Sequence, residues 1–215
     1  MNLRRLGVIA TTLGLAATVA VAAAPAATAS STAPGTRSLA AALTSDGNRF
    51  DRNWYDYDIV TEAVLAVLAA KPASPVGLLT DGTVPLTAFI PNDRAFQVLA
   101  YDLTKKWPTT EEKTFNALVA AAGVDAIEQV LLYHVVPGAA ITKKAAVNAN
   151  GAVLTTAQGA TIKVRVYSRY LPIIELRDQD PDDVNPLLNP RALDINAGNA
   201  QVAHGIVFVL RPLDL

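Results

Sequence analysis

The sequence predicts an α+β fold in which helices pack on an antiparallel sheet or sandwich. The first half of the chain repeats apolar residues at spacings of three and four, which is typical of amphipathic helices. From Tyr133 onward, short β-rich runs alternate with turn residues and indicate strands. Cysteine is absent and 51% of the 215 residues are hydrophobic, so an apolar core rather than disulfides must hold this fold together.

The charge balance argues against a dedicated nucleic-acid-binding protein, because 18 basic residues against 19 acidic ones leave no excess positive charge for a phosphate backbone. Glycine and proline, at 12 and 13 residues, are too few for a collagen-like or low-complexity chain. The length allows one or two domains, and one is the simplest interpretation. We expect a single domain over residues 38–215, preceded by a flexible leader over residues 30–37 that is rich in small and polar residues.

Residues 1–29 have the pattern of a secretory signal peptide. Two arginines precede an uncharged, alanine-rich stretch at 6–24, and Ala27-Thr28-Ala29 fits a cleavage site before Ser30. The alternative is a membrane anchor, since the stretch approaches the ~20 residues that span a bilayer, but its weak hydrophobicity favours cleavage. The paired arginines leave twin-arginine export open as well. We predict a secreted, extracellular protein with no membrane span after signal cleavage.

Local signals place the first helices and the first strand. An apolar stripe follows Asp58, whose carboxylate is placed to cap free amide groups, and predicts a helix that ends near Pro72. Residues 86–90 form a short apolar run that is suited to a strand. Asn92 and Asp93 then turn the chain and begin a second helix, where the carboxylate of Asp93 is favoured by the helix dipole.

Two more short helices are expected before the sheet region. Thr109 and Glu112 have the spacing of a capping box, and Gly123 is suited to end the helix that they begin. Asp125 and Glu128 repeat the capping pattern. The sequence therefore predicts two short helices separated by Gly123.

The first predicted strand of the second half covers residues 133–136 and is closed by Pro137 and Gly138, a strong turn signal. Further candidate strands lie at residues 153–156, 161–167, 173–176, 192–195 and 206–210. The second of these alternates apolar with polar residues, which predicts one buried and one exposed face. The acidic, proline-rich segment 177–189 is expected to be a long surface loop.

The sequence carries no recognisable catalytic motif. Cysteine and a Gly-x-Ser-x-Gly elbow are both absent, and the two histidines, His134 and His204, lie in predicted strands with no spacing for a zinc site. Phosphate-binding glycine loops are absent too. We therefore expect a protein that is not an enzyme, with no catalytic residue, cofactor or metal.

An acidic segment offers an alternative, because oxygen ligands crowd together in it at Asp178, Asp180, Asp182, Asp183 and Asn185. Alternating acidic residues open calcium loops, but here Asp183 replaces the glycine and Asn189 the glutamate that such loops need. A solvated acidic loop is the favoured interpretation, and calcium binding stays open.

A group of aromatic residues offers a second alternative, since Phe50, Trp54, Tyr55 and Tyr57 alternate with acidic residues ahead of the first long helix. Exposed aromatic rings can stack on sugars or anchor a protein partner. We favour the simpler interpretation that Trp54 and Tyr57 pack the leader against the start of the first helix.

Three segments together resemble the fasciclin domain family. Residues 86–96, LTAFIPNDRAF, resemble the first signature box of that family, and residues 132–138, LYHVVPG, resemble the second. The segment from Ala203 to Pro212 resembles its closing histidine strand, although Val207 and Phe208 replace the usual charged pair. Two loops, at residues 101–110 and 168–190, are longer than most members of the family have.

The resemblance implies a wedge of antiparallel sheets with short helices packed on it, in a secreted bacterial fasciclin-like protein that is an adhesion or binding module without a reaction of its own. The partner would be an extracellular protein or polysaccharide. In animal members a Tyr-His pair has been proposed as a receptor contact, which maps to Tyr133 and His134; the alternative is that both are fold residues. A second hypothesis is a cell-envelope structural protein that binds wall polysaccharide through the expanded loops, and a third is a carbohydrate-active enzyme.

Overall fold

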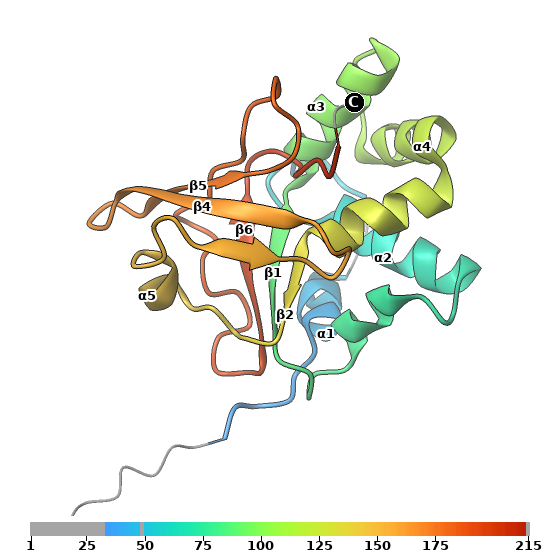
Figure 1. Cartoon of the computed structure of the whole chain (residues 1–215). Coiled ribbons are helices and arrows are strands. Elements are labelled where there is room, and N and C mark those ends of the chain that lie inside the picture. Colours follow the sequence, from blue (N-terminus) through green and yellow to red (C-terminus); the bar gives the residue numbers. More distant parts are fainter. Residues whose placement is uncertain (1–32, 48–49, 214–215) are drawn as a thin grey trace, which may run out of the picture. The chain divides into compact units, whose positions relative to one another are not determined.

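The computed structural model describes residues 33–47 and 50–213, so the predicted signal peptide lies outside the described residues. Figure 1 shows the arrangement of the helices and strands. The helices are α1 (Leu39–Leu43), α2 (Asp58–Ala70), α3 (Asp93–Thr104), α4 (Glu111–Tyr133) and α5 (Lys143–Ala146), with 3₁₀ turns at Thr44–Asp46 and Pro75–Thr80. The strands are β1 (Leu86–Pro91), β2 (Val135–Pro137), β3 (Val153–Thr155), β4 (Thr161–Ser168), β5 (Ile173–Arg177) and β6 (Gln201–Ile206). The predicted α+β class is confirmed.

The central sheet has the strand order β2-β1-β6. β1 pairs with β2 in antiparallel fashion but with β6 in parallel, from Leu86 opposite Gln201 to Pro91 opposite Ile206. This sheet is therefore mixed rather than antiparallel throughout. The strand predicted at residues 206–210 is displaced, because the chain pairs over Gln201–Ile206 and then leaves the sheet.

The second sheet, β3-β4-β5, is antiparallel and lies where the sequence predicted strands. β4 alternates as expected, with Ile162 and Val164 buried and Lys163 exposed. The strand predicted at residues 192–195 is wrong. Asp194 has a φ of 56°, which a strand cannot accommodate, and only an isolated bridge joins Ile195 to Ala203.

The helices of the first half follow the sequence closely. α2 ends two residues before Pro72, and Asn92 caps α3 by accepting a hydrogen bond from the N–H of Ala95 at 3.0 Å. The two helices expected on either side of Gly123 are confirmed, because Gly123 interrupts the helix with a non-helical φ of 76°; both segments carry the single label α4. The cap of α4 is Thr110 rather than Thr109.

The end of α4 corrects the strand predicted at residues 133–136. Tyr133 is the last helical residue, and the N–H of His134 still bonds to the carbonyl of Val130 at 3.2 Å. The strand β2 begins only at Val135. Leu131, Leu132 and Tyr133 are all buried, so tertiary packing on a helical face prevails over the β propensity of this segment.

The side chains of β1 belong to two separate core clusters, one on each face of the central sheet. Ala88 and Ile90 pack with residues of α1–α4 in the first cluster, whereas Phe89 packs with residues of the second sheet. The central sheet is thus covered by helices on one face and by β3-β4-β5 on the other. Because successive side chains of a strand point to opposite faces, one strand links both cores.

The described part of the leader contacts the folded domain at two residues. The N–H of Gly35 donates to the carbonyl of Gly198 at 2.8 Å, and the N–H of Ala200 donates to the carbonyl of Gly35 at 2.9 Å. Gly82 approaches Thr36 so closely that a Cβ there would lie 1.9 Å from its carbonyl oxygen. These contacts join residues 35 and 36 to the segment before β6 and to Gly82.

α4 is long and apolar enough to cross a membrane, judged by length and composition among the described residues. The sequence predicted this segment as two short helices on either side of Gly123, not as a membrane span. In this fold α4 carries Leu118 and Leu131 into the first core cluster, and it contacts α2 and α3. One face of α4 therefore packs into the fold, and 22% of its apolar stretch is buried.

Candidate functional site

The predicted contact residues Tyr133 and His134 lie in the interior. The hydroxyl of Tyr133 donates to the carbonyl of Thr161 at 2.9 Å, and burial raises the pKa of Tyr133 to about 12. His134 Nε2 accepts from the N–H of Leu210 at 2.9 Å, so its Nδ1 carries the proton and donates to the carbonyl of Val130 at 2.7 Å. Neither side chain offers a surface to a partner in this structure.

Both histidines act as neutral connectors inside the fold. Burial lowers the pKa of His134 to about 4, and burial likewise lowers the pKa of His204. His204 Nε2 lies 2.7 Å from the carbonyl of Ile141, and its Nδ1 accepts from the N–H of Asp194 at 3.2 Å. Each ring joins two distant segments of the chain.

The acidic loop at residues 178–183 surrounds the side chain of an arginine. Arg211 Nε lies 2.8 Å from Asp183 Oδ2, and its Nη1 lies 3.4 Å from Asp180, which is only 3% exposed. Arg211 Nη2 contacts Asp102 at 2.6 Å, and the N–H of Arg211 donates to Asp178 at 2.8 Å. We call this arrangement the arginine-clamped loop. The loop still lies at the surface, since Pro181 and Asp182 are exposed, but three of its carboxylates face Arg211.

A second group of carboxylates gathers where three helices begin. Asp58, Asp93 and Glu111 are the first residues of α2, α3 and α4. The N-terminal end of a helix is partly positive and stabilises carboxylates, so the meeting of three such ends favours acidic side chains. Ligand oxygens of Asp51, Asp56 and Glu111 lie within 4.8 Å of one another, and those of Asp56, Asp58 and Asp93 do so too.

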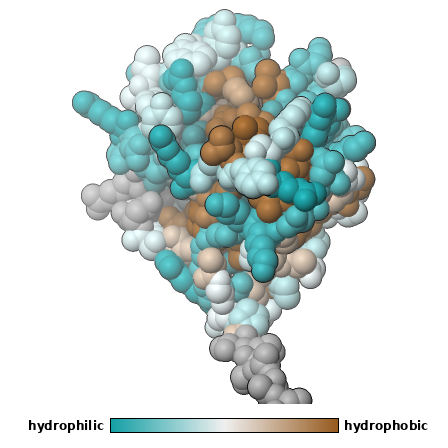
Figure 2. Space-filling model, turned by 90° about the vertical axis from the view of Figure 1, so that its left-hand side faces the viewer, coloured by the Kyte–Doolittle hydropathy of each residue, from teal (hydrophilic) through white to brown (hydrophobic). Residues whose placement is uncertain are grey.

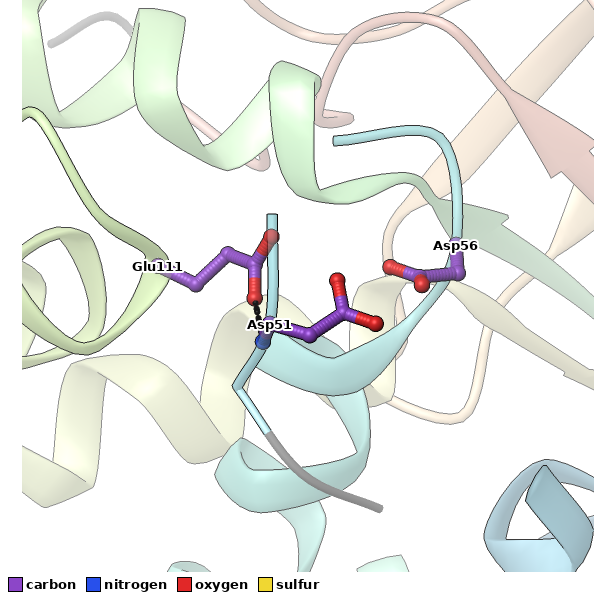
Figure 3. A group of neighbouring side chains, drawn as sticks. All are labelled: Asp51, Asp56 and Glu111. Atoms are coloured by element: carbon purple, nitrogen blue, oxygen red, sulfur yellow. Dashed lines mark hydrogen bonds between the residues drawn. The ribbon is translucent and has the colours of Figure 1, made fainter. Parts of the chain in front are cut away.

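We call Asp51, Asp56 and Glu111 the acidic triad. The carboxylates of Asp51 and Asp56 point toward each other in Figure 3, and Glu111 approaches from α4. The N–H of Asp51 donates to Glu111 Oε2 at 2.5 Å. Glu111 Oε1 and Asp56 Oδ1 are buried and have no hydrogen-bond partner among residues 33–47 and 50–213.

The surroundings of Glu111 and Asp93 disfavour ionisation of their carboxyl groups. Burial raises the pKa of Glu111 to about 7, and the negative charges of Asp56 and Asp51 add to that rise. Burial, together with a hydrogen bond shared with Asp56, raises the pKa of Asp93 to about 9. A buried carboxyl beside other carboxylates keeps its proton to a higher pH, so Glu111 and Asp93 stay protonated to a higher pH than exposed carboxyl groups do.

Asp93 also replaces Asp58 as the cap of α2. Asp93 Oδ1 accepts from the N–H of Ile59 at 2.9 Å, and its Oδ2 accepts from the N–H of Asp58 at 3.3 Å. The carbonyl of Asp56 in turn accepts from the N–H of Asp93 at 3.2 Å. These bonds fix the loop before α2 against the starts of α2 and α3.

The predicted aromatic group divides between core and surface. Phe50 packs on Phe115 with ring centroids 5.8 Å apart, and Tyr57 packs against the first core cluster. Burial raises the pKa of Tyr57 to about 12. Tyr55 is exposed and borders an open hollow with Asn189 and Arg191. Tyr57 therefore packs as the simpler interpretation expects, Trp54 is half-buried, and Tyr55 stays on the surface.

The end of the β4–β5 hairpin is the most prominent exposed apolar feature of the described chain. Tyr170 is 100% exposed and Leu171 is 71% exposed, and Tyr167 is exposed beside them. The guanidinium of Arg165 lies 4.7 Å from the centre of the Tyr167 ring. Figure 2 shows the side of the molecule toward which this hairpin points, where hydrophobic side chains gather among hydrophilic ones.

An apolar cavity of about 240 Å³ lies between α2, α3 and α4. Its walls include the aromatic and aliphatic side chains of Phe96, Leu99, Phe115, Leu118, Ile127 and Leu131. Specific ligand sites combine apolar walls with a few polar groups that fix orientation. The walls of this cavity are formed by apolar residues. They therefore offer a ligand space but no polar group to fix its orientation.

Sequence reasoning did not identify the acidic triad as a site. It treated Asp51 and Asp56 only as spacers among aromatic residues and did not single out Glu111. The available signal was an acidic residue at the start of each of three helices. Their convergence depends on how α2, α3 and α4 pack, which no local pattern reveals.

Comparisons with known proteins agree on one family. The family model described as the Fasciclin domain matches residues 61–210. A solved structure of a FAS1 domain pair from the insect cell adhesion molecule Fasciclin I is similar, with a TM-score of 0.53 and 16% identity over 81% of this chain. The match covers 50% of that structure, so this chain spans about half its length. No curated protein matches the chain. The chain belongs to the fasciclin domain family.

Proposed function

We propose that this protein is an exported fasciclin module that binds an extracellular protein at the cell surface or in the extracellular matrix. Fasciclin domains are known as adhesion or binding modules and are generally non-catalytic. The signal-peptide pattern at residues 1–29 supports export. The proposal further assigns the partner contact to a surface other than Tyr133 and His134, because both are buried.

The observation that carries the proposal is the exposed end of the β4–β5 hairpin. Large apolar side chains that project together from a surface mark interaction sites more often than chance, and tyrosine and arginine are enriched among residues that dominate binding energy. Tyr170 and Leu171 supply the apolar contact, and Arg165 and Arg169 add positive charge. The paired strands hold these residues on a firm base. We expect an extracellular protein with acidic groups around an apolar centre.

The test is retention of the chain from Ser30 onward on isolated cell envelope and on a panel of matrix proteins. A variant with Tyr170→Ala and Leu171→Ala should lose at least about tenfold in affinity, because truncating a central anchor costs about 1–2 kcal/mol or more. Tyr55→Ala is the matched control, since it removes an exposed aromatic ring elsewhere. Equal retention of the hairpin variant and the control would contradict the assignment.

A second candidate function is a structural protein that binds wall polysaccharide through its expanded loops. One observation favours it: Arg169 and Tyr170 lie in the expansion at residues 168–190, next to the Arg165–Tyr167 pair. Aromatic rings stack on sugars and guanidinium groups pair with their carboxylates or phosphates. Pull-down on acidic and neutral polysaccharides at low and high salt would support this function if only the acidic polymer retains the chain.

A further inference from the structure

We propose that Asp51, Asp56 and Glu111 form a binding site for a divalent cation, and that the cation is calcium. The first support is the spacing of their oxygens, which lie within 4.8 Å of one another. Calcium holds each oxygen ligand at about 2.3–2.6 Å, so two oxygens on one ion are at most about 5 Å apart. One ion can therefore touch all three carboxylates with little movement of the chain.

The second support is independent of the number of acidic residues. Glu111 is 0% exposed, yet within the described part of the chain its Oε1 has no hydrogen-bond partner, and the buried Asp56 Oδ1 has none there either. Leaving a buried acceptor unsatisfied costs about 1–3 kcal/mol, and more when the group is charged. A cation between these two oxygens would satisfy both at once.

The hydrogen bonds that do exist engage one oxygen of Glu111 and one of Asp51. Glu111 Oε2 accepts from the N–H of Asp51, and Asp51 Oδ1 accepts from the N–H of Asn53, both at 2.5 Å. Each carboxylate is thus oriented through one oxygen while the other remains for a ligand. Asp93 stands behind the site, since both of its oxygens accept from the start of α2.

The charge of the acidic triad is not balanced by side chains of the described residues. Across residues 33–47 and 50–213, no lysine or arginine forms an ion pair with Asp51, Asp56 or Glu111. The carboxylates of the arginine-clamped loop, by contrast, have Arg211. A doubly charged ion would neutralise the carboxylates of the acidic triad, as Arg211 neutralises those of the loop.

The ligand chemistry selects calcium among divalent ions. All three side chains offer carboxylate oxygens, which suit hard cations, whereas zinc and copper prefer nitrogen or sulfur. Asp51 is exposed, so water can complete the six to eight ligands that calcium takes. Two of the ligands come from a loop, which suits the flexible geometry of calcium better than the strict octahedron of magnesium.

The test is a calcium titration of the chelator-treated chain from Ser30 onward, followed by calorimetry and by the melting temperature. Calcium is expected to bind one site and to raise the melting temperature, and magnesium at the same concentration should raise it less. Glu111→Gln should weaken binding at least tenfold and abolish the calcium-dependent shift. Glu112→Gln, the exposed neighbour, is the matched control and should behave like the unchanged chain.

Three results would overturn the proposal. The first is the absence of binding heat and of a melting shift up to about 10 mM calcium, beyond the range of weak extracellular calcium modules. The second is an unchanged calcium response in Glu111→Gln, and the third is an equal response to magnesium, which would refute calcium as the ion. If Glu111→Gln fails to fold, Asp51→Asn changes an exposed ligand and carries the same expectation.

Discussion

The arginine-clamped loop and the acidic triad both bring several carboxylates together, some of them buried. They differ in whether a positively charged side chain neutralises those carboxylates. In the loop, Arg211 contacts Asp102, Asp180 and Asp183, and its N–H bonds to Asp178. In the triad, the backbone N–H of Asp51 is the donor to Glu111, and two buried oxygens have no partner. We therefore interpret the carboxylates that pair with Arg211 as part of the folded framework. We interpret the acidic triad, which has no such partner among the described residues, as a binding site for a cation. Each prediction below tests that difference.

The largest expected effect is the removal of the internal cation. Arg211→Met should lower the free energy of unfolding by about 3–5 kcal/mol, because it leaves the buried carboxylate of Asp180 without its partner. Denaturant unfolding measures this loss. Arg191→Met, at an exposed position, is the control and should change stability by less than about 0.5 kcal/mol. A loss as small as the control's would mean that the loop does not depend on Arg211.

Acid should destabilise the fold through His134, apart from either acidic region. The ordinary pKa of histidine is about 6.5, and burial lowers that of His134 to about 4. The folded state therefore binds fewer protons than the unfolded state between these values, and stability is lost as the pH falls from about 6.5 through 4. The loss attributable to His134 should reach about 3 kcal/mol.

Urea unfolding at pH 7 and pH 4 measures this loss, with His134→Gln as the comparison. The variant should lose less stability between the two pH values than the unchanged chain. An equal loss in both would assign the acid sensitivity to other groups, His204 among them.

The same conservative change should have opposite effects in the two acidic regions. Asp180→Asn removes a buried charge that Arg211 compensates, and it should lower stability by about 1–2 kcal/mol. Glu111→Gln removes a buried charge that no described cation compensates, and in chelator at pH 8 it should raise stability by about 1 kcal/mol. Denaturant unfolding of both variants measures the signs.

The smallest effect is expected at the hairpin, which belongs to neither region. Tyr170→Ala and Leu171→Ala together should change stability by less than about 0.5 kcal/mol, because both side chains are exposed. Thermal unfolding checks this result. A larger loss would show that the hairpin end packs against the fold, and a weaker retention of that variant could then no longer be assigned to a lost contact.

The sequence predicted those parts of the fold whose signals are local. The apolar stripe of α2, the cap at Asn92 and the alternation in β4 depend on neighbouring residues, and all three are confirmed. Tyr133 and His134 were misplaced because burial on a helical face outweighs β propensity. The parallel pairing of β1 with β6 joins segments more than 100 residues apart, which no local pattern specifies.

The candidate sites depended even more on tertiary structure. Arg211 reaches Asp102 across 109 residues of chain, so the acidic loop read alone resembles a solvated or calcium-binding segment. The acidic triad draws two residues from a loop and one from the start of α4. Its chemistry becomes visible only when the starts of three helices meet.

The most direct test of the contrast is the stability of Asp180→Asn and Glu111→Gln, measured side by side by denaturant unfolding at pH 8 with chelator present. We expect Asp180→Asn to be less stable than the unchanged chain and Glu111→Gln to be more stable. Adding calcium should then stabilise the unchanged chain and Asp180→Asn but not Glu111→Gln. Destabilisation by both substitutions, with no response to calcium, would contradict this account. It would show that the acidic triad, like the arginine-clamped loop, needs no bound ion to compensate its charge.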